Sequence, residues 1–199
     1  MNIHKVISTV FHPVVIPSLG ILLYFMFVSH SIQKSQQLLL LALIFGITYM
    51  IPMLILILLR SLRFIKNFQV ETIEERKFPV LMMLILFFVL GDILADIYSL
   101  RDIGYLFYGA SLGLFCTYVL FSFKIKSSLH LLSMGTTIGF FLLLMNIYGL
   151  PLLLLVIILI VLSGLIASSR LHLNAHSPNE LAVGFLLGLL SQTIIFLAL

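Results

Sequence analysis

The stretch that decides the fold lies near the end of the chain, where residues 151–167 read PLLLLVIILIVLSGLIA. This run carries no charge and approaches the roughly 20 apolar residues that an α-helix needs to cross a bilayer core. Similar runs recur along the whole chain, and they predict spans at residues 13–28, 37–59, 80–98, 103–121, 129–148, 151–167 and 181–199. The sequence therefore predicts an all-α, polytopic transmembrane helix bundle of about seven helices.

The composition of the chain agrees with a membrane protein. Of the 199 residues, 62% are hydrophobic and 9% are charged, against roughly 25% charged residues in a soluble domain. We expect one integral membrane domain over residues 1–199. The start of the chain is weakly basic and lacks a small-residue cleavage site, which favours a retained first helix over a signal peptide. No basic segment is longer than a loop, so we expect no nucleic-acid partner.

The longer connections between the predicted spans indicate which side of the membrane they share. They lie near residues 60–79, 123–129 and 168–179, and two crossings separate each from the next. All three must therefore lie on the same side as the N-terminus, and the C-terminus on the other. Most Lys and Arg residues lie on the side of these connections, which the positive-inside rule assigns to the cytoplasm. We expect the chain to reside in the cell membrane.

The last of these connections carries the most specific polar pattern, SRLHLNAHSPNELAVG at residues 169–184. Ser177 and Glu180 flank a proline as in a capping box, which predicts a helix that begins near Pro178, directly after His176. A phosphate at this point would face the free N–H groups and the positive end of that helix. Arg170 adds a bidentate guanidinium, and a nearby carboxylate orients an imidazole. Alternatively Glu180 only caps the helix, and both roles can hold at once.

These residues resemble the third signature of the type-2 phosphatidic acid phosphatase family, which is related to the vanadium haloperoxidases. The family pattern is SRxxxxxHxxxD, and Ser169, Arg170 and His176 match it at full spacing. Glu180 stands where the family has aspartate, so the carboxylate is kept on a longer side chain. The resemblance implies a core of six transmembrane helices in which His176 attacks phosphorus, Arg170 holds the phosphoryl group and Glu180 orients His176.

The stretch KIKSSLH, which ends at His130, resembles the second family signature, PSGH. Ser128 and His130 match that pattern, whereas Ser127 replaces the proline and Leu129 replaces the glycine. By this resemblance His130 is the general acid and Ser128 a phosphate contact, and the charge of Lys126 compensates for the lost glycine. The alternative is a helix-capping serine followed by a histidine at the membrane interface.

The first family signature, KxxxxxxRP, has the weakest counterpart, EERKFP at residues 74–79. Arg76 is the candidate phosphate ligand there, and Lys77 is a further one. The family lysine has either moved to Lys66 or Lys77 or been lost. A basic loop that sets the membrane topology explains these residues equally well.

Three other groups of polar or small residues have separate interpretations. Asp92 and Asp96 share one face of a span, which indicates an ion or proton pathway or a solvated boundary position for Asp96. The histidines at 130, 172 and 176 fit no standard metal spacing, so we expect no metal and no cofactor. Gly184 and Gly188 form a GxxxG step, which marks close helix packing within the bundle or a homo-oligomer through the last helix.

Together these features predict a metal-independent phosphatase that hydrolyses a lipid phosphate or lipid pyrophosphate through a phosphohistidine. Membrane lipid and a lipid phosphate substrate are the expected partners. The alternative is a non-catalytic, degenerate relative that binds lipid headgroups or transports a small anion.

Overall fold

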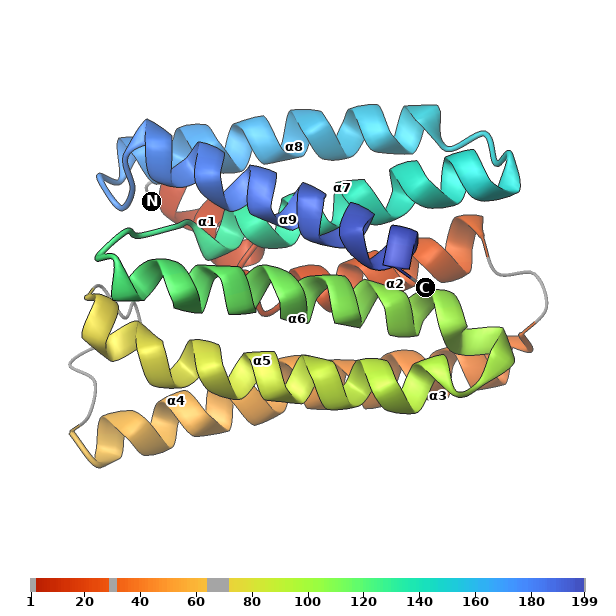
Figure 1. Ribbon diagram of the computed structural model, residues 1–199, viewed down its shortest axis with the longest axis horizontal. Helices are drawn as coiled ribbons and strands as arrows, with labels where there is room; N and C mark the ends of the chain where they lie inside the picture. The colour runs from red at the N-terminus through yellow and green to blue at the C-terminus, as the bar shows by residue number, and fades with distance from the viewer. Residues whose placement is uncertain (1–2, 29–31, 64–71, 199) are drawn as a thin grey trace.

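The computed structural model describes residues 3–28, 32–63 and 72–198, and all regular structure within these ranges is helical. The helices run along one common direction (Figure 1). Six of the described segments are long and apolar enough to cross a membrane. They are α3 (Lys34–Phe45) continued by η1 (Gly46–Met50) and α4 (Ile51–Ser61), α5 (Ile73–Ala95), η2 (Tyr98–Leu100) with α6 (Arg101–Ser122), α7 (Leu129–Tyr148), α8 (Leu153–His172) and α9 (Pro178–Ala198). The predicted all-α transmembrane bundle is confirmed, and the chain is a multi-pass membrane protein.

The first crossing differs from the predicted single span at 13–28. It consists of two short helices, α1 (Ile3–Val10) and α2 (Ile16–Phe27), which together run from one end of the bundle to the other (Figure 1). Pro13 has no N–H to donate and disfavours helical backbone at the residue before it, so the helix breaks there. Pro17 is tolerated because it lies in the first turn of α2.

The second crossing contains an irregular turn at its centre. Pro52 is the second residue of α4 and follows the π-helical turn η1 directly. A proline ring clashes with the carbonyl four residues before it, and the wider π turn relieves that clash. Within η1, the buried Thr48 hydroxyl lies 3.1 Å from the hydroxyl of Ser18 on α2. The irregularity before Pro52 is thus a π turn that contacts the first crossing.

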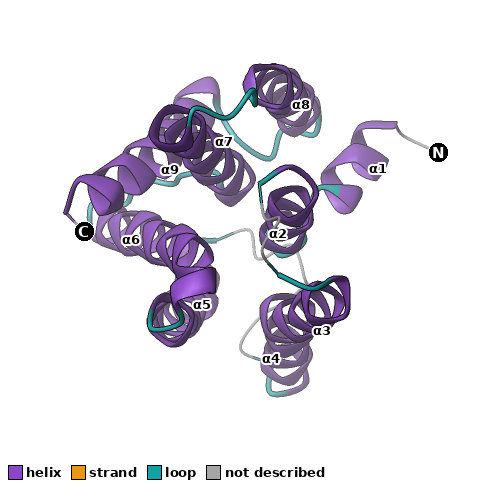
Figure 2. Ribbon diagram, turned by 90° about the vertical axis from the view of Figure 1, so that its right-hand side faces the viewer, coloured by secondary structure: helices purple, strands orange, loops and turns teal. Residues whose placement is uncertain are grey.

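Helix α7 is the most buried of the long helices, and it lies against α9 and α8 (Figure 2). Its contact with α9 depends on glycines on both helices. A Cβ atom at Gly184 would collide with the carbonyl of Ser128, and one at Gly188 would collide with the carbonyl of Leu132. The GxxxG step of the last helix is therefore used for packing within the chain. A homo-oligomer through this helix stays a prediction.

The ends of the helices follow the connectivity that the sequence predicted. The N-terminal end of α1, the loop 123–128 and the loop 173–177 lie at one end of the bundle, with the C-terminal end of α4 and the start of α5 (Figure 1). The C-terminus lies at the opposite end with residues 96–100 and 149–152. Three polar stretches far apart in the sequence are thus brought to one rim.

Two helix boundaries differ from the predicted ones at this rim. Helix α5 begins at Ile73 rather than at residue 80, because the Thr72 side chain accepts a hydrogen bond from the Glu75 N–H at 3.2 Å and caps the helix. Helix α8 continues to His172 rather than ending at residue 167. Arg76 and Arg170 therefore lie on terminal helical turns, which hold them more firmly than loops.

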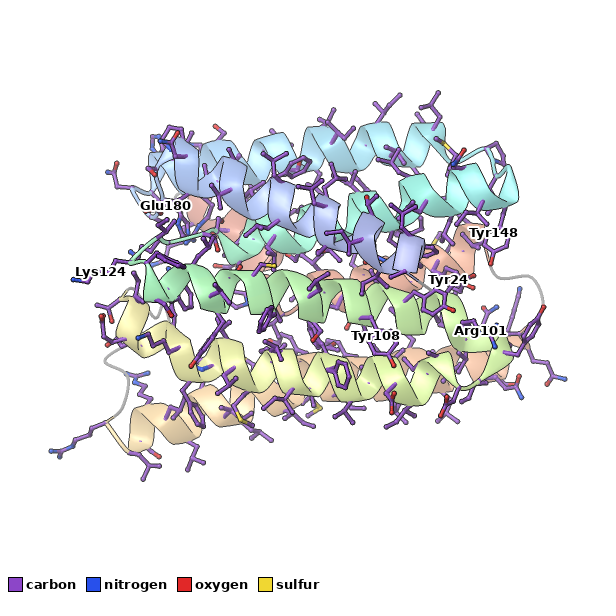
Figure 3. All side chains as sticks on the ribbon, viewed as in Figure 1. Tyr24, Arg101, Tyr108, Lys124, Tyr148 and Glu180 are labelled. Atoms are coloured by element: carbon purple, nitrogen blue, oxygen red, sulfur yellow. The ribbon has the colours of Figure 1, made fainter. Side chains whose placement is uncertain are left out.

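At the opposite rim a carboxylate joins three helices. Asp102, in the first turn of α6, accepts hydrogen bonds from the hydroxyls of Tyr24 at 3.1 Å and Tyr148 at 3.0 Å. Figure 3 shows both tyrosines near this end, far from Lys124 and Glu180. This cluster fixes α2 against α6 and α7, so the short first crossing has a polar anchor.

The close approach of α7 and α9 makes a testable prediction about stability. Gly188→Ala places a methyl group against the backbone of α7, and overpacking of this kind costs roughly 1–3 kcal/mol. Gly164→Ala on α8 is the matched control, because a Cβ there meets open space and alanine favours a helix over glycine. Thermal unfolding in detergent should show a lower midpoint for Gly188→Ala and an equal or higher one for Gly164→Ala. Equal midpoints for both variants would contradict the packing described here.

Candidate active site at the bundle rim

A cavity of about 170 Å³ opens at the rim where the three polar stretches meet. Five ionisable side chains from different segments line it: His12, Arg76, His130, Arg170 and His176. They come from the α1–α2 connection, α5, α7, the last turn of α8 and the α8–α9 loop. The structure therefore brings together one candidate residue from each of the first two predicted signature segments and two from the third.

His176 is held by the carboxylate of Glu180, which lies at the same end of the bundle as Lys124 (Figure 3). The distance from Nδ1 of His176 to Oε2 of Glu180 is 2.6 Å. Because an ionised carboxylate only accepts hydrogen bonds, Nδ1 carries the proton and Nε2 keeps its lone pair. The Glu180 N–H donates to the Ser177 hydroxyl at 3.3 Å, and α9 begins at Pro178 as predicted. Glu180 thus takes part in the helix cap and also forms a hydrogen bond with the imidazole of His176.

The surroundings of His176 lower the pKa of its imidazole. Its side chain is 1% exposed, and this burial lowers the pKa of His176 to about 4 from an ordinary value near 6.5. The positive charges of Arg76 and Arg170 lower this pKa as well, whereas the hydrogen bond to Glu180 raises it. At neutral pH the ring is therefore uncharged, which is the state a nucleophile needs.

The two arginines supply positive charge beside that ring. Arg170 donates from Nη1 to the hydroxyl of Ser8 at 2.8 Å, while its buried Nε has no hydrogen-bond partner among the described residues. Arg76 is 7% exposed on the first turns of α5. A buried donor without a partner is costly, and Arg170 also lines the cavity, where its guanidinium group supplies positive charge for an anion.

His130 is fixed by the first helix rather than by a side chain. Its Nε2 lies 3.1 Å from the backbone carbonyl of Ser8, which can only accept, so Nε2 carries the proton. The ring of His12 meets that of His130 edge to face, with centroids 5.6 Å apart.

The remaining predicted phosphate ligands lie outside the cavity wall. Lys77 is exposed on α5, and Lys126 is half-buried in the loop before α7. Ser128 is fully buried, and its backbone N–H donates to the carbonyl of Glu180 at 3.0 Å. Its hydroxyl has no partner in the described part of the chain, yet it does not line the cavity. The alternative lysine position, Lys66, lies outside the described residues.

The polar residues that suggested other functions lie elsewhere. Asp92 and Asp96 are exposed on the outer surface of α5 and its end, and the Tyr108 hydroxyl donates to Asp92 at 2.9 Å. His172 is exposed and stacks on His4 of α1, with ring centroids 4.0 Å apart. Within the described ranges no three His, Cys, Asp or Glu side chains gather in a way that could hold a metal ion.

Sequence reasoning missed the contribution of the first helix. Ser8 contacts both Arg170 and His130, His12 lines the cavity, and Ser169 of the third signature lies 3.4 Å from Nδ1 of His4. No motif marks Ser8 or His12. Only the position of His12 at the start of the first apolar run, on the same side as the three polar stretches, pointed to this rim.

Comparisons with known proteins give no further information about the site, since no family model, no curated protein and no solved structure matches the chain.

The environment of His176 predicts an unusual titration. In a protein labelled with ¹³C in its histidine rings, the His176 resonance, assigned by its loss in His176→Ala, should titrate near pH 4. Glu180→Gln should move the midpoint lower still, because the carboxylate stabilises the protonated ring. A midpoint near 6.5, or one that Glu180→Gln leaves unchanged, would contradict the buried pair.

Proposed function

We propose that the chain is a membrane-embedded phosphatase that hydrolyses a lipid phosphate or lipid pyrophosphate through a phosphohistidine, as its resemblance to the type-2 phosphatidic acid phosphatase family implies. One observation carries the proposal: the imidazole of His176, oriented by a carboxylate at 2.6 Å, lines the same cavity as two arginines and the imidazole of His130. A nucleophile, an orienting base, cations for the phosphoryl oxygens and a proton donor are the groups that this reaction class requires.

In the first step, the lone pair on Nε2 of His176 attacks phosphorus. An N–P bond forms as the bond between phosphorus and the lipid oxygen breaks, and the bonding electrons leave with that oxygen. His130, in its protonated form, supplies the proton that completes the lipid alcohol, or the lipid phosphate when the substrate is a pyrophosphate. Since Nε2 of His130 is bonded to the Ser8 carbonyl, the transferred proton comes from Nδ1.

In the second step, water attacks the phosphorus of the phosphohistidine. His130, now neutral at Nδ1, accepts the proton from that water, and the N–P bond electrons return to His176. The products are inorganic phosphate and the original imidazole. The bond from Nδ1–H of His176 to Glu180 persists through both steps, because the positive charge on the phosphorylated ring is stabilised by the carboxylate.

The cations of the site act on the phosphoryl oxygens. Arg170 lines the cavity, its buried Nε has no hydrogen-bond partner among the described residues, and the buried Arg76 lies near it. Guanidinium groups match the geometry of phosphate oxygens, and the start of α9 contributes the partial positive charge of a helix N-terminus. Positive charge that is already positioned around the phosphoryl group stabilises the transition state, which lowers the activation free energy of phosphoryl transfer.

The location of the cavity supports a lipid substrate. Its polar end lies at one rim of the membrane-spanning bundle, where a lipid headgroup would be within reach. We propose the cell membrane as its location, with this rim toward the cytoplasm, since most of the Lys and Arg residues lie on this side.

Phosphate release from purified protein tests the proposal. With a lipid phosphate in detergent micelles and a chelator present, the unaltered protein should release inorganic phosphate. His176→Ala should lower kcat by roughly 10⁶-fold, because the nucleophile is lost. Arg170→Ala should lower it by about 10²-fold, as removal of one oxyanion donor does.

Lys124→Ala is the matched control, because it removes an exposed cation from the same rim. It should leave kcat close to that of the unaltered protein. Release that persists in His176→Ala overturns the mechanism. Binding of lipid phosphate without any release by the unaltered protein would instead favour a non-catalytic protein that binds headgroups.

A further inference from the structure

His12 is the cavity histidine that the proposed reaction leaves without a role. It lies in the break between α1 and α2, and its side chain lines the cavity together with those of His130 and His176. The rings of His12 and His130 are neighbours, with centroids 5.6 Å apart and planes at 74°. His12 therefore lies beside the proposed proton donor, in the wall of the cavity where the phosphoryl group is transferred.

A tight turn of the backbone holds the ring of His12. The His12 carbonyl accepts a hydrogen bond from the Val15 N–H at 2.8 Å. This bond closes a turn with Pro13 at its second position, where the fixed φ of proline is favoured. The Val14 N–H donates to Nδ1 of His12 at 3.4 Å, as it would to an asparagine side chain at the start of such a turn. The backbone and the side chain of His12 are thus both fixed before α2 begins.

The turn also determines which nitrogen of the His12 ring carries the proton. A ring nitrogen that accepts from an N–H has no proton of its own, so the proton of His12 lies on Nε2. His176 differs, because its N–H is bonded to Glu180 and a lone pair is left on the other nitrogen. The neutral ring of His130 differs in the same way, because its N–H is bonded to the Ser8 carbonyl. Nε2–H of His12 has no acceptor among the described residues.

The other uncharged side-chain donors of the cavity lining are used within the protein. Ser133, Thr136 and Thr137 line the cavity, and each hydroxyl donates to a carbonyl of its own helix at 2.9–3.0 Å. Among the described lining residues, Nε2–H of His12 is the uncharged side-chain donor that remains for a ligand. Because Arg76 and Arg170 line the same cavity, an anion with several acceptor oxygens is the ligand that suits all three side chains.

We propose that His12 is a further catalytic residue of this cavity, whose Nε2–H donates a hydrogen bond to a non-bridging oxygen of the phosphoryl group while the group passes to His176. The inference rests on the proposed function for the reaction, and it adds a third ligand of the phosphoryl oxygens to the two arginines. Negative charge is spread over these oxygens during phosphoryl transfer. A donor that is already positioned beside them stabilises the transition state.

Two substitutions of His12 separate this role from its part in the turn. In His12→Asn the amide oxygen lies at about the place of Nδ1 and still accepts from the Val14 N–H, but nothing replaces Nε2–H. In His12→Gln the longer side chain brings an amide N–H to about the place of Nε2, whereas the acceptor at the place of Nδ1 is lost. Asparagine would therefore replace a residue that only holds the turn, and glutamine one that binds the phosphoryl group.

Release of inorganic phosphate from a lipid phosphate in detergent micelles gives the comparison. His12→Asn should lower kcat by about 10²-fold with KM nearly unchanged, as expected when one donor to the transition state is removed. His12→Gln should retain kcat to within about tenfold, because its amide N–H replaces the donor. Thermal unfolding in detergent checks that both variants are folded. The reverse order, or equal kcat in the two variants, overturns the catalytic role of His12.

A second measurement uses the unaltered protein and needs no turnover. With ¹⁵N in the histidine rings, the Nε2–H signal of His12, assigned by its absence in His12→Gln, is followed as inorganic phosphate is added. The signal should shift in a saturable manner, because the N–H gains an acceptor. A His12 signal that stays in place throughout the titration overturns the contact.

The two measurements also distinguish failure of this inference from failure of the phosphatase. Release of phosphate by the unaltered protein, together with a His12 signal that does not move, keeps the phosphatase and removes His12 from its mechanism. A saturable shift without any release removes the phosphatase and with it the catalytic role, and leaves His12 as a ligand of a bound anion.

Discussion

The site depends on one backbone contact between the starts of two helices. The Ser128 N–H donates to the Glu180 carbonyl at 3.0 Å, directly where α7 and α9 begin. This bond is possible because Gly184 lets the backbones of the two helices approach so closely that a side chain there would collide with Ser128. It fixes the first turn that carries His130 beside the first turn that carries Glu180. This backbone contact therefore sets the distance between the helix that carries His130 and the helix start beside His176. A bilayer core offers no water to satisfy backbone groups, so such contacts must form within the protein.

The first crossing supplies further residues of the site. Its break near Pro13 lets α1 lie against the end of α8 while α2 enters the bundle, so that Ser8 meets both Arg170 and His130. His12, in the break itself, closes the same side of the cavity. The break between α1 and α2 thus lets Ser8 and His12 join the residues of the rim. The irregular crossings, α1–α2 and α3–α4, both border the cavity, whereas the regular helices form its rigid side.

Much of the fold follows from the sequence, because apolar runs that must cross a bilayer allow few arrangements. The six later spans, the opposite positions of the two termini, the common rim of three polar stretches and the helix start at Pro178 agree with the prediction, although several span boundaries differ. The break near Pro13 and the extension of α5 to Ile73 were not predicted, since both depend on single residues, Pro13 and Thr72, whose local effect competes with a long apolar pattern.

The candidate site was predicted only in its outline. The spacing from Arg170 to His176 and Glu180 placed these residues correctly relative to one another, because they are joined by one short loop. Arg76 and His130 were found through the shared rim. Ser8 and His12 carry no motif and join the site only through tertiary packing, and the lysines at 77 and 126 were favoured by charge alone, which does not determine which way a side chain points.

The central claim is that His176 carries the phosphoryl group. Its most direct test is a rapid acid-free quench of the protein during turnover of a lipid phosphate labelled with ³²P, followed by digestion and mass spectrometry of the peptide around the α8–α9 loop. The account predicts an acid-labile phosphoryl group on the imidazole of residue 176 that disappears when the substrate is exhausted. Steady release of phosphate with no label on that residue, or with label on another side chain, would contradict it.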